Sequence, residues 1–508
     1  MRARRWLSTL LLGSLVLLLC GGCEDESWWH VPDDLVTSDS VSINGKVYLL
    51  SPYGNRVIQV DRVTLDVRSV EVGRNPRVLT TDEGEDAPGH IYTINQDDHT
   101  LSVIDIEAFD ANPTEYVPDE LQLRPFFDQL IFSPSGNVVV SYIGSDVDEA
   151  DLVGQGSVNP NEIAIIDLTA DPRTVEFRTL DARPTDVVFT ADGSKAVIPM
   201  QTDLAVLYMG TLDVLRYPFS LDSADPARPA LVRTSPDSSR VFASVTGETD
   251  VYIIDMDTGI FETIIATPFV PRDIQVTPDG ERTIVAGGST SVVVFDNVIF
   301  EPESLEVGTG VDTLVLDDDT DVAFALAYNA SYQQSSFATI EFDEGAPEVE
   351  TYVTDAPISR IEIDPTGQTA VIFHTNSGYG SGKLSMFNLT QRHPSTILLE
   401  SAPHDLTFIP SEDEAIEPIG YVMVVLKDSN TLVRYSLSTY EAVVIGVAEN
   451  PDAVGMVHAQ DNATDGSFAY VVHDEPLGLL TFLNPYRPLA MPAGFPTVYG
   501  YGLVGLLD

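Results

Sequence analysis

The sequence predicts an all-β fold, a β-propeller built of four-stranded blades, and three observations support this prediction. A β-hairpin pattern recurs along the whole chain, at an average spacing of about 46 residues. An apolar run that ends in Asp or Asn follows most hairpins by about twenty residues, and a further strand pattern follows that run. No helical periodicity exceeds a turn or two, and Gly, Pro and Asp interrupt the chain throughout. Four short strands per repeat are typical of a propeller blade.

The clearest copy of the hairpin lies at residues 184–200. Val187 and Phe189 alternate with polar neighbours, as they do in a half-buried strand. Asp192-Gly193 supplies the left-handed backbone that a hairpin turn needs, and a second apolar run follows. We therefore expect the first and second strands of a blade here.

Ten such units run through residues 32–508, and three arrangements are consistent with them. The units begin at Pro32, Pro76, Pro125, Pro184, Pro229, Pro271, Gly310, Pro357, Pro403 and Pro451. They form one ring of ten blades, a smaller ring with degenerate units attached, or two smaller propellers. No linker rich in Gly, Ser or Pro interrupts the period, which favours one continuous propeller of seven to ten blades. Residues 497–507 look like another first strand, which would close the ring against the first unit.

Two of the best copies carry a resemblance to a known family. Residues 271–280 read Pro-Arg-Asp-Ile-Gln-Val-Thr-Pro-Asp-Gly, and residues 251–259 read Val-Tyr-Ile-Ile-Asp-Met-Asp-Thr-Gly. This pair of motifs resembles the YVTN family of propeller repeats, and the resemblance covers residues 32–508. It implies the propeller fold but no particular activity, because such folds host many unrelated functions.

Residues 1–22 have the pattern of a secretory signal peptide. Three arginines within the first five residues precede an apolar stretch, and Gly22 stands directly before Cys23. The segment resembles a bacterial lipoprotein signal, although Cys20 replaces the usual Leu. The resemblance implies a lipid on Cys23, a tether over residues 23–31 and a place in the bacterial cell envelope, at the outer membrane or the periplasmic face. An ordinary cleaved signal is the alternative.

The composition is strongly acidic. The chain has 78 Asp and Glu residues against 26 Lys and Arg, a formal net charge of −52. Such a field repels phosphates, so we expect no nucleic-acid partner. It attracts cations or basic partners, or it serves only to keep an exported protein soluble.

Unequal loops indicate a recognition face. In a propeller the loop between the second and third strands lies on the same face as the connections between blades, and it is enlarged at residues 144–157, 329–335 and 374–382. These loops either bind a partner or are solvated insertions. The candidate binding residues are Asp146, Asp148, Glu149, Tyr332, His374 and Tyr379.

A second group of candidates follows the first residue of several units. At a channel mouth these carboxylates would hold a divalent cation such as calcium, as the resemblance to lactonase-like propeller enzymes implies. The alternative is that each carboxylate bonds the neighbouring backbone and fixes the blade turn. The residues are Asp128, Asp186, Asp273, Asp312 and Asp405.

The sequence carries no familiar catalytic motif. It has no Gly-x-Ser-x-Gly, no His-Glu-x-x-His, no P-loop and no dinucleotide fingerprint, and both cysteines lie in the signal segment. We therefore expect a lipid-anchored module that binds a protein, peptide or glycan, without a catalytic residue or an obligatory cofactor. A metal-dependent hydrolase that uses the channel carboxylates is the alternative.

Overall fold

The computed structural model describes most of the predicted propeller. The described residues are 40–502, apart from 63, 83–88, 146, 148–151, 153–157, 220–227, 317–322, 332–333, 343–346, 376–381, 412–416, 449, 458–467, 475–478 and 487–497. The predicted signal segment (residues 1–22) and the predicted tether (residues 23–31) therefore lie outside the described residues.

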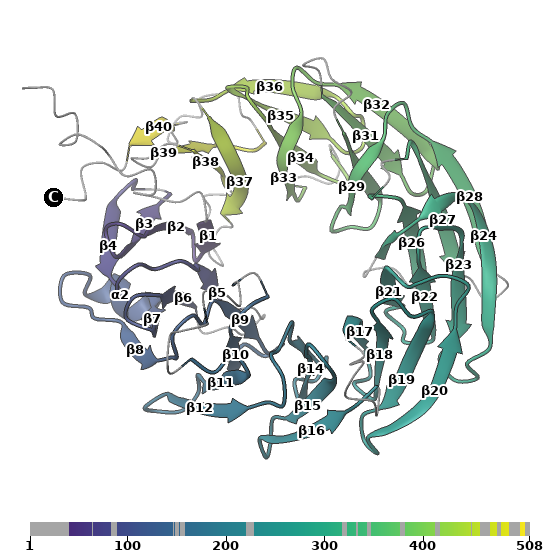
Figure 1. The fold of residues 1–508 in the computed structure, drawn as a ribbon. Coiled ribbons are helices and arrows are strands. Elements are labelled where there is room, and N and C mark those ends of the chain that lie inside the picture. Colours follow the sequence, from purple (N-terminus) through teal and green to yellow (C-terminus); the bar gives the residue numbers. More distant parts are fainter. Residues whose placement is uncertain are drawn as a thin grey trace, which may run out of the picture.

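Within the described residues, ten four-stranded antiparallel sheets surround a wide central opening (Figure 1). In every sheet the strands pair in sequence order, with the first strand next to the opening and the fourth at the rim. The predicted all-β propeller is confirmed, and so is the count of ten units in one ring. A pair of smaller propellers and a smaller ring with attached units are both excluded by this arrangement.

The blades are numbered here in chain order. Blade 1 comprises β1 to β4 (Ser40–Ile43, Lys46–Ser51, Arg56–Asp61, Val67–Glu71) and blade 2 comprises β5 to β8 (Thr80–Thr81, His90–Asn95, Thr100–Asp105, Asp119–Gln122). Blade 3 comprises β9 to β12 (Gln129–Phe132, Val138–Tyr142, Glu162–Asp167, Thr174–Thr179) and blade 4 comprises β13 to β16 (Val188–Phe189, Lys195–Pro199, Leu204–Tyr208, Asp213–Tyr217). Blade 5 comprises β17 to β20 (Pro229–Thr234, Arg240–Val245, Asp250–Asp255, Ile260–Ala266).

The second half of the ring continues in the same way. Blade 6 comprises β21 to β24 (Asp273–Val276, Arg282–Ala286, Ser289–Asp296, Pro302–Val311) and blade 7 comprises β25 to β28 (Thr313–Leu316, Ala323–Tyr328, Ser336–Phe342, Glu348–Val353). Blade 8 comprises β29 to β32 (Ile358–Ile363, Thr369–His374, Lys383–Asn388, His393–Leu398) and blade 9 comprises β33 to β36 (Pro403–Ile409, Tyr421–Leu426, Thr431–Ser436, Ala442–Gly446). Blade 10 comprises β37 to β40 (Pro451–Val457, Phe468–His473, Leu479–Leu483, Val498–Gly502).

One short helix, α2 (Ile106–Ala111), follows β7. The side chain of Asp105 caps its first turn by accepting a hydrogen bond from the Ala108 N–H at 2.9 Å, which satisfies a backbone donor that the helix itself leaves free.

The Asp-Gly turns form as the sequence predicts. Gly193 has a φ of 66°, the left-handed conformation that glycine adopts without steric cost. Asp192 accepts hydrogen bonds from the Thr190 hydroxyl at 2.7 Å and from the Ser194 N–H at 3.0 Å. These bonds, led by that from Thr190, lower the pKa of Asp192 to about 2. The carboxylate therefore stays charged and holds the turn in shape.

Every pair of neighbouring blades encloses its own hydrophobic cluster. Successive side chains of a strand point to opposite faces of its sheet. On β2, Tyr48 and Leu50 pack into the cluster shared with blade 2, whereas Val47 and Leu49 pack into the cluster shared with blade 10. Both faces of the central strands are thus buried, which explains why the sequence shows continuous apolar runs there instead of strict alternation.

The last of these clusters closes the ring. Blades 1 and 10 pack together through residues that include Leu49, Tyr470 and Phe482, all buried. At the same contact, the Ser42 hydroxyl donates a hydrogen bond to the Met456 carbonyl at 2.7 Å. Closure is therefore made by side-chain packing and hydrogen bonds between the two ends of the chain.

The final strand corrects one prediction. The segment from residue 497 was expected to begin a new unit as a first strand, but β40 pairs with β39 as the outermost strand of blade 10. The prediction was wrong because fourteen residues, 484–497, separate β39 from β40, so that the fourth strand of this blade falls where a new unit would begin at the average spacing.

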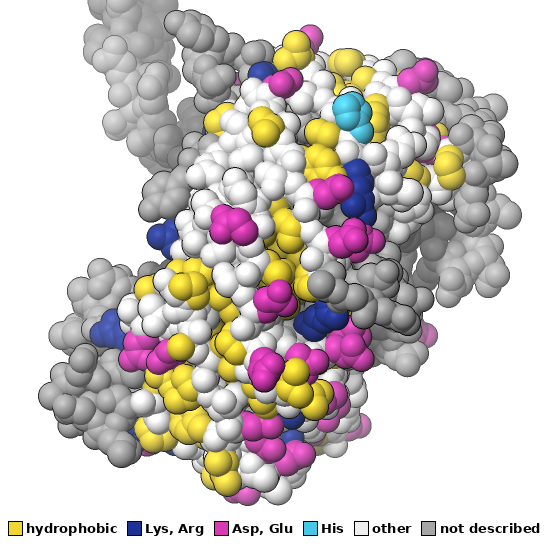
Figure 2. Space-filling view, turned by 90° about the vertical axis from the view of Figure 1, so that its right-hand side faces the viewer, with side chains coloured by type: hydrophobic (Ala, Val, Ile, Leu, Met, Phe, Trp, Pro, Cys, Tyr) yellow, Lys and Arg dark blue, Asp and Glu magenta, His cyan; other side chains and the backbone are white. Residues whose placement is uncertain are grey.

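The surface at the rim is acidic and mixed. Figure 2 views the ring from the side on which β24 lies, and Asp and Glu side chains are scattered there among apolar ones. Among the described residues, no helix has the length and apolar character needed to cross a membrane.

Truncating the closing contact should destabilise the whole ring. Phe482 is 1% exposed, so Phe482→Ala removes a large side chain from the cluster between blades 1 and 10. We expect the free energy of unfolding to fall by about 3–5 kcal/mol in chemical denaturation. Val353→Ala, at a residue that is 75% exposed, is the control and should change it by less than about 0.5 kcal/mol. A loss for Phe482→Ala as small as that for the control would contradict closure through this cluster.

Candidate functional site

The antiparallel order of every blade gives the ring two different faces. One face carries the connections between blades and the loops between second and third strands, and we call it the connection face. The other carries the loops between first and second strands and between third and fourth strands, and we call it the turn face. The enlarged loops that the sequence singles out belong to the connection face.

Most of the predicted binding residues lie outside the described residues. Asp146, Asp148, Glu149, Tyr332 and Tyr379 all fall there, and their roles stay predictions. The start of the first enlarged loop is described, and Arg183 of the next blade holds it. The buried Arg183 guanidinium donates hydrogen bonds to the carbonyl groups of Gly144 and Val147, the latter at 3.0 Å.

His374 is the one predicted binding residue that the structure describes, and it is 4% exposed at the end of β30. Its Nε2 lies 2.7 Å from the Ser385 hydroxyl, and its Nδ1 lies 3.2 Å from the Pro357 carbonyl oxygen. A carbonyl oxygen only accepts, so Nδ1 carries the hydrogen and Nε2 accepts from Ser385. Burial lowers the pKa of His374.

The same arrangement recurs in two other blades. The last residue of β6, Asn95, donates to the Ser102 hydroxyl at 2.7 Å, and His473 at the end of β38 lies 2.8 Å from the Thr481 hydroxyl. In each case a polar residue that ends the second strand bonds a hydroxyl on the third strand. The position of His374 therefore fits a repeated structural bond better than a flat contact surface.

Two of the predicted metal ligands cap loops of their own blades. Asp128 accepts a hydrogen bond from the Gly144 N–H at 2.6 Å, and burial raises its pKa. Asp312 accepts from the N–H groups of Ala330 at 2.8 Å and Ser331 at 3.1 Å. Burial opposes ionisation of Asp312, but the bonds from Ser331 and Ala330 outweigh it and lower the pKa.

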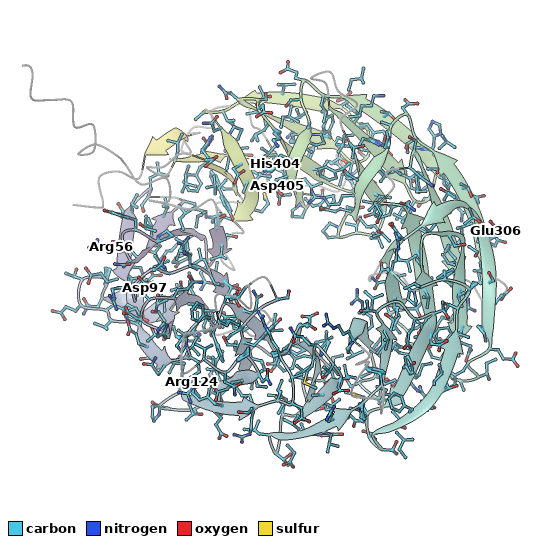
Figure 3. The ribbon with its side chains drawn as sticks, viewed as in Figure 1. Arg56, Asp97, Arg124, Glu306, His404 and Asp405 are labelled. Carbon is cyan, nitrogen blue, oxygen red and sulfur yellow. The ribbon has the colours of Figure 1, made fainter. Side chains whose placement is uncertain are left out.

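Two others connect their blade to the next one. Asp273 of blade 6 accepts from the Leu314 N–H of blade 7 at 2.8 Å, and the Arg233 guanidinium of blade 5 lies 3.6 Å from its other oxygen. Asp405 of blade 9 accepts from the Val454 N–H of blade 10 at 2.9 Å. Figure 3 shows Asp405 beside His404 at the inner edge of the ring. These carboxylates therefore join neighbouring first strands.

The fifth carboxylate, that of Asp186, is exposed and accepts a hydrogen bond from the adjacent Val187 N–H at 2.8 Å. Among the described residues, no three His, Cys, Asp or Glu side chains lie close enough together to hold a metal ion. The carboxylates instead bond backbone N–H groups, which is the alternative that the sequence left open.

A hollow that the sequence did not reveal lies on the connection face, between blades 1 and 2. It has a volume of about 290 Å³, and three separate segments form it. These are the turn between β2 and β3 (residues 52–55), the connection between β4 and β5 (residues 72–79) and the turn between β6 and β7 (residues 96–99). We call it the blade 1–2 hollow.

Hydrogen bonds fix the frame of the blade 1–2 hollow. The Asn75 N–H donates to Asn55 Oδ1 at 2.9 Å, and Asn75 Nδ2 donates to Asp97 Oδ1 at 3.1 Å. Arg74 donates to both carboxylate oxygens of Asp98, at 2.6 and 2.7 Å, and this pairing lowers the pKa of Asp98. The three segments are thus tied to one another before any ligand arrives.

Two side chains of this hollow remain available. Tyr53 is 67% exposed, and among the described residues it is the only aromatic side chain that stands so far into solvent. Arg77 is also exposed, and its guanidinium has no partner in the described part of the chain. Arg183 and Arg434 also have no carboxylate partner among the described residues, but they donate to backbone carbonyl groups, whereas the Arg77 guanidinium donates to none there.

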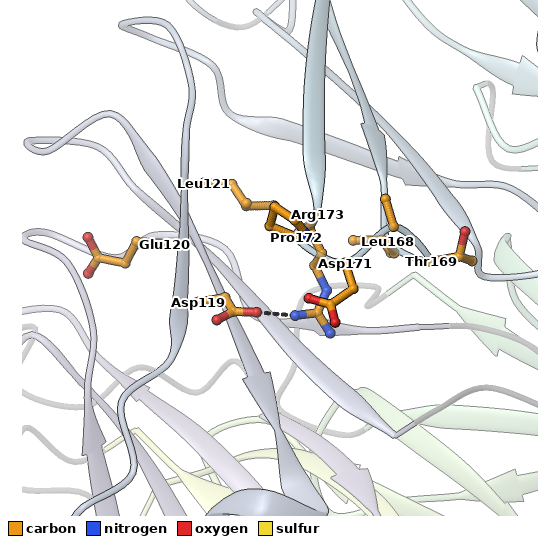
Figure 4. A pocket seen from close by; sticks show the side chains of 9 residues that line it. Asp119, Glu120, Leu121, Leu168, Thr169, Asp171, Pro172 and Arg173 are labelled. Atoms are coloured by element: carbon orange, nitrogen blue, oxygen red, sulfur yellow. Dashed lines mark hydrogen bonds and ion pairs between the residues drawn. The ribbon is translucent and has the colours of Figure 1, made fainter.

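A larger pocket lies on the turn face, between blades 2 and 3. It has a volume of about 500 Å³ and is lined by β8 and by the turn between β11 and β12 (Figure 4). Arg173 forms an ion pair with Asp119 across it. The pocket therefore sits over a link between the two blades.

His90 extends that link into the protein. Its Nδ1 lies 3.2 Å from the buried Asp82 carboxylate, and Arg173 donates to its Nε2 at 2.9 Å. A guanidinium only donates, so Nε2 is an acceptor and Nδ1 carries the hydrogen. The Asp–His pair has the geometry of a general base, but Arg173 occupies the nitrogen that a nucleophile would need.

The pH dependence of stability should report the burial of His374. Because burial lowers the pKa of His374 in the folded chain, the unfolded chain binds this proton at a higher pH. The free energy of unfolding should therefore fall as the pH falls below about 6.5, by up to about 1.4 kcal/mol per pH unit for this one group. His374→Gln should reduce that slope in denaturation at several pH values, and His393→Gln, at an exposed residue, should not. An unchanged slope for His374→Gln would contradict this account.

Asp273 distinguishes the structural role of the carboxylates from a metal-binding role. Asp273→Ala leaves the Leu314 N–H and Arg233 without their partner, so we expect the free energy of unfolding to fall by about 1–3 kcal/mol. The loss should be the same in calcium and in EDTA. Asp186→Ala, at an exposed carboxylate, is the matched control with little effect. A loss that appears only in the presence of calcium would instead support a metal site.

Comparison with known proteins finds only remote likenesses to solved structures. No family model and no curated protein matches the chain. Among solved structures, it is similar to a eukaryotic initiation factor (TM-score 0.49, 10% identity, 72% of this chain and 88% of that chain). It is also similar to the dihydro-heme d1 dehydrogenase NirN (TM-score 0.45, 13% identity, 70% and 72%) and to a protein of unknown function from Desulfotomaculum acetoxidans (TM-score 0.35, 14% identity, 61% and 98%). Each of these TM-scores is below 0.5 and each identity is below 15%, so the description of the fold rests on the chain itself.

Proposed function

We propose that this protein is a lipid-anchored propeller of the cell envelope that binds a protein, peptide or glycan on its connection face. The pattern of residues 1–23 is the basis for the anchor and the location. The observation that carries the binding role is the blade 1–2 hollow, where Tyr53 and Arg77 stand exposed on a hydrogen-bonded frame.

An exposed aromatic ring costs free energy, because its apolar surface stays in contact with water. The chain buries large rings such as Tyr48, Tyr92 and Phe242 completely, yet it leaves Tyr53 in water on a rigid turn. An exposed ring beside an arginine offers contact area and hydrogen bonding at a small cost in side-chain entropy, and both residue types dominate the binding energy of protein interfaces. The frame is already ordered, so little entropy is lost when a partner binds.

The ring geometry supports a binding module in a second way. Loops on a rigid scaffold are the usual place for recognition residues. On the connection face, the enlarged loops around residues 144–157 and 374–382 share this side with the blade 1–2 hollow. No observation on the described residues favours the metal-dependent hydrolase.

Site-specific photo-cross-linking in cells tests the proposal. The full chain with its own N-terminal segment would carry a photoreactive phenylalanine at position 53, on the connection face, or at position 298, an exposed turn-face residue. We expect a discrete cross-linked product in the membrane fraction from position 53 and none from position 298. The variant Cys23→Ser should release the chain from that fraction.

Two results would overturn the proposal. Identical products from positions 53 and 298 would mean that the connection face has no special role. The absence of any product from position 53, in cells where the chain is folded and membrane-bound, would mean that Tyr53 meets no partner.

A further inference from the structure

We propose that the blade 1–2 hollow binds one ring of a neutral sugar, stacked on Tyr53. This inference rests on the proposed function and names the ligand class of the same site. It follows from the pattern of donors and acceptors that the frame leaves free, together with the charge around them.

The free polar groups of the hollow suit hydroxyl groups. Asn55 Oδ1 is used by the Asn75 N–H, and Asn75 Nδ2 is used by Asp97, which fixes how both amides are turned. The amide nitrogen of Asn55, the amide oxygen of Asn75 and one carboxylate oxygen of Asp97 have no partner in the described part of the chain. A ligand must therefore accept from some of these groups and donate to others, and a hydroxyl does both.

The ring of Tyr53 provides a flat apolar surface beside these polar groups. An aromatic face carries partial negative charge, which attracts the weakly positive C–H groups on one side of a sugar ring. Arg77, at the same hollow, supplies up to five donors in a planar fork that suits two adjacent oxygen atoms. Stacking on a flat ring beside planar polar groups is an arrangement that matches a cyclic polyhydroxyl compound.

Charge decides between a neutral and an acidic ligand. Asp97 contributes a carboxylate to the wall itself, and the whole chain has a formal net charge of −52. An anionic sugar or a peptide carboxylate would be repelled by the nearby carboxylate and would approach against the field of the protein. Arg74 also lines the hollow but is paired with Asp98, and Arg77 balances Asp97, so the hollow itself is close to neutral. The field of the whole chain then disfavours an anion, whereas a neutral sugar is insensitive to that field.

The size of the hollow sets how much of the ligand it holds. Its volume of about 290 Å³ lies at the lower end of the range for small-molecule sites, roughly 300–1,000 Å³, and it is open to solvent. Such a space holds a single ring with room for the chain to continue outward on both sides. We therefore expect recognition of one unit within a longer glycan, with modest affinity.

Titration of the full chain with defined oligosaccharides tests this inference. The neutral probes are oligomers of glucose, galactose, mannose and N-acetylglucosamine, and the acidic probe is oligoglucuronate. We expect at least one neutral oligomer to bind in calorimetry, with saturation transfer in NMR concentrated on the C–H protons of one ring. Tyr53→Ala should weaken that binding by about tenfold, while Tyr53→Phe should retain it within about threefold because the ring is kept.

Asp97→Asn distinguishes a neutral ligand from an acidic one. It replaces a charged acceptor of the site by a neutral acceptor, so it should weaken binding of the neutral oligomer by about threefold to tenfold, because hydrogen bonds to a charged group are the stronger ones. If the ligand were acidic, the same change would strengthen binding instead. Val298→Ala, at an exposed residue of the turn face, should change nothing.

The inference is overturned if no neutral oligomer binds, if oligoglucuronate binds more tightly than every neutral probe, or if Tyr53→Ala leaves the affinity unchanged. If position 53 captures a protein in cells but no sugar binds, the proposed binding function is kept and the sugar site is overturned. If neither a cross-linked product nor sugar binding is found, the proposed function and the sugar site are both overturned.

Discussion

Burial of both faces of every blade is the constraint on which this structure depends. Each sheet packs against two neighbours, and a separate hydrophobic cluster fills each gap, including the gap between blades 1 and 10. A blade alone would expose two apolar faces, so its stability comes from its neighbours, as in other repeat proteins. Because the chain closes on itself, none of the ten described blades is left with an uncovered face.

This constraint also decides where chemistry is placed. Successive side chains of a central strand pack into two different hydrophobic clusters, so these side chains are not available to contact a ligand. Polar residues at strand ends are used to join strands and blades, as His374 joins Ser385 and as Asp273 joins Leu314. What remains for recognition are the loops and connections, and the blade 1–2 hollow is built of three of them.

The fold was predictable because its turns recur with the same local sequence pattern. The site was not predictable because its residues lie in separate segments that only the folded chain brings together. Hairpin turns such as Thr190 to Ser194 depend on local hydrogen bonds, so their sequence pattern survives in each copy. The residues of the hollow come from three separate segments of two repeats, with Tyr53 and Asn75 in the first and Asp97 in the second, and the packing of blades 1 and 2 brings them together. His374 looked like a loop residue, but β30 extends far enough to bury it.

Hydrogen exchange of the full chain is the most direct test of the closed ring. The amides of β2 and β38 lie at the contact between the two ends of the chain, and those of β18 and β19 lie within the continuous part of the ring. In a closed ring all four strands are buried on both faces, so their amides should exchange with similar slow rates under native conditions. Rapid exchange confined to β2 and β38 would mean that the ring opens between blades 1 and 10, and would contradict the account.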